Sequence, residues 1–172
     1  MFRILAVILI SSLMIQAAVA DDIYQQPAVF IRRAFAETPP APQKLWITGE
    51  LRKQATSILG HAPESLRISY WRRGDRTAWI LDEVGKELPI TAGFVIDNGK
   101  VAAVRVLIFR ESRGGEIRYP FFTDQFAGSM LDQEDRLNRE IDGISGATLS
   151  VNAITKLTRL ALLYHQQVTT GE

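Results

Sequence analysis

The sequence predicts an α+β fold, in which an antiparallel β-meander carries helices packed on one face. Two observations predict the sheet: apolar and polar residues alternate from Ser65 onward, and Asn98-Gly99 separates two β-rich runs. A third predicts the covering helix, because apolar residues between Ser150 and Gln166 recur at i, i+3, i+4 spacing. Of the 172 residues, 47% are apolar and 23% charged, which is the balance of a folded domain.

Four consecutive strands make up the expected meander. Their alternation or β-branched content places them at residues 65–70, 77–84, 90–96 and 100–109. The segment 72–75, Arg-Arg-Gly-Asp, reads as the first turn. Asn98 and Gly99 supply the two positive-φ residues of a type I′ turn, so the last two strands form a hairpin.

The segments around the meander are less regular. Thr48 to Leu59 is predicted to be a helix, with Thr48 as its cap and Gly60 as its stop. Residues 21–42 hold four prolines and are expected to be weakly structured, with a short helix or strand at 28–35. We therefore divide the chain into a signal segment (1–20), an N-terminal extension (21–63) and a main domain (64–168).

The first twenty residues have the pattern of an export signal. Arg3 precedes an apolar run from Ile4 to Ile15, and Ala18-Val19-Ala20 is the small-x-small pattern of a cleavage site. The run is short for a membrane span, which needs about 20 apolar residues. We expect a cleaved signal peptide and a periplasmic protein, with an uncleaved N-terminal anchor as the alternative.

Composition excludes several classes of function. The chain has 20 basic and 19 acidic residues, so it lacks the basic field of nucleic-acid-binding proteins, and no nucleic-acid partner is expected. Cysteine is absent, which excludes disulfides, thiolate nucleophiles, iron–sulfur clusters, Cys-ligated zinc, c-type haem attachment and lipoprotein acylation. His61 and His165 are the two histidines. We assign no metal-binding and no catalytic residues.

A glycine-containing turn before the last helix carries the most chemical information. It runs Asp142-Gly143-Ile144-Ser145-Gly146-Ala147-Thr148. Free N–H groups at a helix start, together with the helix dipole, favour a bound anion such as a phosphate. The alternative is that these residues only cap the helix, with Asp142 closing a turn.

This turn resembles the flavinylation motif of FMN-binding domains, Asp-x-x-(Ser/Thr)-Gly-Ala-Thr. Such domains occur in sodium-pumping NADH:quinone reductases, Rnf complexes, the regulator NosR and exported flavoprotein reductases. Asp142, Ser145, Gly146, Ala147 and Thr148 match every specified position. The resemblance implies FMN joined to Thr148 as a phosphoester, attached by a flavin transferase that uses FAD and a divalent metal.

A second segment is similar to the family pattern His-x-Glu-Thr-Pro-Gly-Leu-Gly. In residues 109–116, Glu111 and Gly114 match and Ser112 keeps a hydroxyl, whereas Phe109 replaces His and Arg113 replaces Pro. Glu111 and Ser112 are therefore added to the expected FMN-binding residues, and the details of the ring pocket stay open. The resemblance covers roughly residues 76–166.

Some nearby residues are candidates for contact with the cofactor. Phe121, Phe122 and Phe126 either stack on a flavin ring or fill the core. Arg110, Arg113 and Arg118 either neutralise an anion or form a solvated face.

The resemblance implies an exported flavoprotein that carries electrons between a membrane-side donor and a periplasmic acceptor, rather than a stand-alone enzyme. Its expected partners are the flavin transferase and a membrane-bound or periplasmic redox protein. A binding or sensory module of the same fold, or a small flavin-dependent reductase, remains the alternative.

Overall fold

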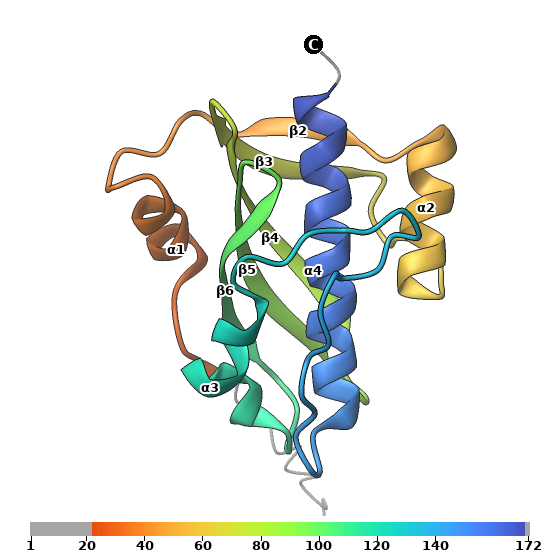
Figure 1. The fold of residues 1–172 in the computed structure, drawn as a ribbon. Helices are drawn as coiled ribbons and strands as arrows, with labels where there is room; N and C mark the ends of the chain where they lie inside the picture. Colours follow the sequence, from red (N-terminus) through yellow and green to blue (C-terminus); the bar gives the residue numbers. More distant parts are fainter. Residues whose placement is uncertain (1–21, 171–172) are drawn as a thin grey trace, which may run out of the picture.

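Six antiparallel strands form one sheet, in the order β1-β6-β5-β4-β3-β2 (Figure 1). The computed structural model describes residues 22–170, so the predicted export signal at residues 1–20 lies outside the described residues. The strands are β1 (Asp22–Ile23), β2 (Gln43–Trp46), β3 (Arg67–Arg73), β4 (Arg76–Val84), β5 (Pro89–Asp97) and β6 (Lys100–Phe109). The helices are α1 (Pro27–Ala34), α2 (Gly49–Leu59), α3 (Pro120–Thr123) and α4 (Thr148–Thr169), with short 3₁₀ turns η1 (Gly115–Arg118) and η2 (Asp124–Phe126).

The meander from β3 to β6 confirms the predicted α+β fold. At the β5–β6 turn, Asn98 and Gly99 have φ values of 50° and 72°, which are the positive angles that the Asn-Gly pair predicts. The first turn is tighter than expected, because Arg72 and Arg73 belong to β3 and pair with β4.

Helix α4 covers one face of the sheet and α2 lies beside it (Figure 1). The stripe that predicted α4 is buried: Ile154, Leu157 and Ala161 are fully enclosed against strand residues such as Trp79 and Phe94. Helix α4 ends at Thr169, three residues after the predicted end at Gln166, and it begins at Thr148, two residues before the predicted start at Ser150.

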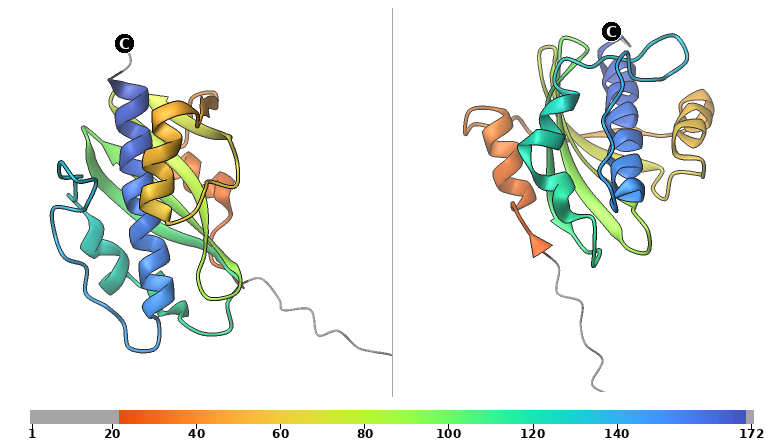
Figure 2. Two further views of the ribbon diagram at one scale, coloured as in Figure 1. Left: turned by 90° about the vertical axis from the view of Figure 1, so that its right-hand side faces the viewer. Right: turned by 60° about the horizontal axis from the view of Figure 1, so that its bottom comes forward.

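Helix α1 lies on the opposite face, which corrects the expectation that all helices pack on one face. The right-hand view of Figure 2 shows α1 and α4 on opposite sides of the sheet. Phe30, Ile31 and Phe35 pack there against Ala78, Val95 and Leu107. The central strands are apolar on both faces, so a second cover is needed to keep these side chains from water.

Residues 22–63 join the same sheet and core as the rest of the chain. Strand β1 pairs with β6, and β2 pairs with β3. Helix α2 buries Leu51, Ala55 and Ile58 in the core that α4 also fills. Strands β1 and β2 were not predicted, because segments of two and four residues show no period.

The sheet opens between β3 and β4. Their pairing runs from Arg73–Arg76 only as far as Tyr70–Trp79. Beyond that point, β3 residues 67–69 pair with β2, and β4 residues 80–84 pair with β5. The two halves of the sheet therefore diverge towards the end of the molecule where β4 turns into β5.

Candidate functional site

Thr148 is the first residue of α4. This helix begins at the lower end of the molecule in Figure 1. Its side chain is exposed, and the loop 142–147 leads into it. Gly146 has a φ of 83°, a left-handed angle that glycine adopts without strain. The Ala147 N–H donates to the Ile144 carbonyl at 2.9 Å, which closes the turn before the helix.

The start of α4 has no side-chain cap. Ala147 occupies the N-cap position, and a methyl group accepts no hydrogen bond. Across residues 22–170, no protein acceptor is found for the amides of residues 148–150. Three free N–H groups and the positive end of the helix dipole therefore meet at Thr148, which is the geometry that holds a phosphate.

A concave site of about 620 Å³ surrounds this helix start. Its wall opposite the helix comes from the β4–β5 turn and from the segment after β6. The lining residues are Lys86, Glu111, Ser112, Arg113 and residues 146–150. Lys86 and Arg113 bring two cations towards the free amides, so the site favours an anionic ligand.

The structure brings together five of the seven sequence-predicted residues: Glu111, Ser112, Gly146, Ala147 and Thr148. Ser145 and Asp142 are exposed in the loop and do not line the site. The loop is held at Asp142, whose backbone N–H donates to Gln125 Oε1 at 2.7 Å.

Glu111 supports the site rather than facing it with a free carboxylate. Its Oε1 accepts the backbone N–H groups of Lys86, Glu87 and Leu88 at 2.5, 2.6 and 2.9 Å. Partial burial disfavours the charge of Glu111, but these three bonds outweigh it and lower the pKa of the carboxyl. Glu111 thereby fixes the turn that carries Lys86 to the site.

Gly114 allows the segment after β6 to pack closely on α4. Its φ is 90°, and a Cβ at this position would lie 2.7 Å from Ser150 Oγ. Any other residue would be strained at this φ, and its Cβ would force the Ser150 hydroxyl to move. Gly114 is also a position that the resemblance matched.

The aromatic and arginine candidates divide into two groups. Phe122 and Phe126 are fully buried and pack edge to face at 5.3 Å, so they belong to the core. Phe121 is 62% exposed beside Tyr119. Arg113 lines the site, whereas Arg118 lies over Tyr24 and Tyr119, and Arg110 donates to the Pro89 carbonyl and to Thr91.

Lys86 is the charged site residue that sequence reasoning missed; Leu149 and Ser150 also line the site and were not predicted. Lys86 lies in a turn of no recognised pattern, 62 positions before Thr148. The Glu111 carboxylate holds the turn that carries Lys86 to the site. No sequence pattern links Glu111 to this turn.

The family model described as FMN-binding domain matches residues 85–163. Residues 85–163 are therefore similar to an FMN-binding domain. The match spans both walls of the concave site, from Gly85 to the helix α4. Comparison with curated proteins and with solved structures found no match to the chain.

The residues of the concave site fit the phosphate end of FMN. The free amides, Lys86 and Arg113 are donors and cations suited to a phosphate, and Thr148 places a hydroxyl beside them. Within residues 22–170, no three His, Asp or Glu side chains converge as metal ligands.

Proposed function

We propose that this protein carries FMN covalently on Thr148 and works as an exported electron carrier. One observation supports this most directly: the motif threonine is exposed at an uncapped helix start, inside the match to the FMN-binding domain. A hydroxyl there is accessible to a modifying enzyme and lies next to donors for the phosphate.

The attachment step follows from the chemistry of FAD. Thr148 Oγ1 replaces AMP at the flavin-side phosphorus, so one P–O bond forms as the pyrophosphate bond breaks and the hydroxyl proton is released. The free amides of α4, with Lys86 and Arg113, then balance the charge of the phosphodiester. Asp142 stands outside this site, and we assign it to presenting the loop to the flavin transferase.

Bound FMN would supply one- and two-electron transfer, and the chain would hold it at the surface. The site is open to solvent, and Thr148 and Leu149 are exposed beside it. An exposed redox group suits exchange with docked protein partners, here a membrane-side donor and a periplasmic acceptor.

Two measurements test the attachment. Protein co-expressed with a flavin transferase and purified from the periplasm should be yellow and fluoresce on a denaturing gel. Trypsin should leave the flavin on the peptide from Glu140 to Lys156, carrying the mass of an FMN phosphoester. A colourless protein whose peptide is unmodified would exclude the proposal.

The proposed location rests on residues 1–20. We expect the mature chain to begin at Asp21, after Ala18-Val19-Ala20. No helix among residues 22–170 is both long and apolar enough to span a membrane. Intact mass of the exported protein decides the matter: a mass that still includes residues 1–20 identifies the segment as an anchor.

A further inference from the structure

A cavity of about 150 Å³ lies where β3 and β4 diverge. One wall is the β3 side, with Ile47, Ile68 and the loop 61–65, and the other is the end of β4. Leu59, Leu160 and Tyr164 line its buried end, and the lining is mostly apolar. None of these residues lines the site around Thr148, so the cavity is separate from the proposed flavin attachment.

Tyr164 lines this cavity, and its hydroxyl has no protein partner among residues 22–170. Tyr164 is 1% exposed, and across residues 22–170 its hydroxyl makes no hydrogen bond. Ser129 Oγ is the one fully enclosed and unbonded side-chain polar atom in that range. The Tyr164 hydroxyl is therefore not fully enclosed, and we infer that it opens onto the cavity that Tyr164 lines. An O–H at this position needs an acceptor oxygen, which water or a ligand can supply.

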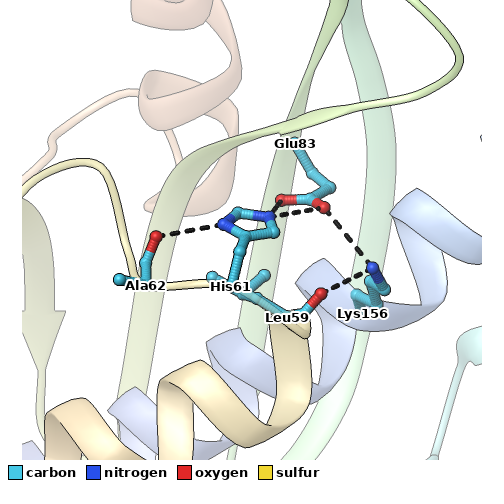
Figure 3. Close-up of polar contacts among 5 residues, drawn as sticks. All are labelled: Leu59, His61, Ala62, Glu83 and Lys156. Atoms are coloured by element: carbon cyan, nitrogen blue, oxygen red, sulfur yellow. Dashed lines mark hydrogen bonds and ion pairs between the residues drawn. The ribbon is translucent and has the colours of Figure 1, made fainter.

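The charges beside the cavity are already paired (Figure 3). Glu83 accepts His61 Nε2–H at 3.1 Å and lies 3.6 Å from Lys156 Nζ, which also donates to the Leu59 carbonyl. His61 Nδ1–H donates to the Ala62 carbonyl at 3.0 Å. A carbonyl and a carboxylate only accept, so these contacts favour the imidazolium form of His61 and raise its pKa.

Glu83 is thus compensated by two cations, and no unpaired buried charge is directed at the cavity. Its other carboxylates, Glu64 and Asp82, are exposed. A charged ligand would lose its hydration at the buried end without gaining a partner there. A neutral ligand avoids this cost.

We propose that the cavity between β3 and β4 binds a small neutral single-ring molecule that places one acceptor oxygen against the Tyr164 hydroxyl. A cavity of this volume holds a benzene-sized ring. The ring contacts Leu59, Ile68 and Leu160, and its carbonyl or ether oxygen accepts the buried O–H.

Acetophenone and ethylbenzene are the two probes, because they share a phenyl ring with a two-carbon side chain and ethylbenzene lacks the carbonyl oxygen. Binding is measured by calorimetry and by amide shifts of the mature chain, made without a flavin transferase. The outcome is then independent of flavin attachment. Acetophenone should bind saturably and roughly two- to tenfold more tightly than ethylbenzene.

Tyr164→Phe should remove this difference, leaving both probes with the affinity of ethylbenzene. The variant keeps the ring and deletes an unbonded hydroxyl, so its melting temperature should not fall. Ile68→Trp fills the cavity from the β3 wall and should prevent binding of both probes. The proposal is overturned if neither probe saturates, which leaves water as the occupant, or if Tyr164→Phe still prefers acetophenone.

Discussion

The first residues of α4 and the segment around Tyr164 meet opposite surroundings. At the beginning of α4, Thr148 and Leu149 are exposed, and the amides of residues 148–150 have no acceptor among the described residues 22–170. Near its other end, Tyr164 and His165 are 1% and 3% exposed. One helix therefore joins an end fixed in the core to an end available for chemistry, which holds Thr148 steady without covering it.

The buried end is fixed by a polar contact as well as by packing. The Gly99 N–H donates to His165 Nε2 at 3.2 Å, so that nitrogen carries a lone pair. The other nitrogen, Nδ1, then donates to Thr77 Oγ1 at 2.9 Å. Neutral His165 thereby ties α4 to both the β5–β6 turn and β4. No comparable contact occupies the amides at the exposed end.

The largest expected effect is at the exposed end. Thr148→Ala should abolish covalent flavin, because it removes the oxygen that forms the phosphoester. Folding should be nearly unaffected, since a surface change of this kind costs within about 0.5 kcal/mol. Denaturing-gel fluorescence and a thermal melt check both points. Thr148→Ser and Ser145→Ala are the controls and should keep the flavin; covalent flavin in Thr148→Ala would refute the assignment.

Asp142→Ala should lower flavin incorporation strongly while leaving the fold intact. Asp142 lies six residues before Thr148 in an exposed loop, outside the concave site. If it only closed a turn, its loss would cost roughly 1 kcal/mol of stability and little flavin. Co-expression with the transferase separates the two cases, and incorporation near the wild-type level would show a structural role.

Changes in the buried part of α4 should lower stability and leave flavin attachment intact, which is the reverse of the effect of Thr148→Ala. Leu157→Ala removes a fully enclosed side chain and should cost about 2–5 kcal/mol of unfolding free energy, measured in urea. Flavin should still attach at temperatures where the variant is folded. Leu149→Ala, at the exposed end, is the matched control and should cost well under 1 kcal/mol. Equal losses in the two variants would contradict the contrast between the ends.

The smallest expected effect is on the pH dependence of folding stability. Burial lowers the pKa of His165 below 6.5, so as pH falls below about 6.5 the unfolded chain takes up a proton that the folded chain refuses. Stability should therefore fall on the acid side, by at most about 1.4 kcal/mol per pH unit. His165→Gln should flatten this slope in urea titrations.

His61 should change the pH dependence of folding stability in the opposite direction from His165. Its hydrogen bonds to Ala62 and Glu83 raise its pKa, so its stabilisation is present at low pH and is lost as pH rises through the folded value. The effect should be small because the side chain is 47% exposed. If His61→Gln and His165→Gln shifted the pH dependence in the same direction, the two assigned protonation states would be wrong.

Local patterns predicted the parts of the fold that local forces decide. The Asn98-Gly99 turn and the stripe of α4 depend on neighbouring residues, and both are present. Strand β1 forms only because Ile23 meets Ile108 of β6, a partner 85 positions away. The place of α1 likewise depends on which face of the finished sheet is left uncovered.

The residues of the concave site also divide into those that a local motif predicts and those that depend on contacts distant in the sequence. Gly146, Ala147 and Thr148 lie together because they are consecutive, and a motif is sufficient to find them. Lys86 reaches them through a turn held by Glu111, a contact across 25 positions. The cavity beside Tyr164 depends on the position at which β3 and β4 stop pairing. No spacing of residues in the sequence predicts this position.

The contact of Glu111 with the β4–β5 turn has a consequence for the order of folding. The hairpin of β4 and β5 is complete in sequence at Asp97, but the oxygen that binds three of its turn amides arrives only with Glu111, after β6. We therefore expect this turn to be fixed only after β6 has been made and has docked. Slow exchange of the amide protons of residues 86–88 should likewise depend on Glu111.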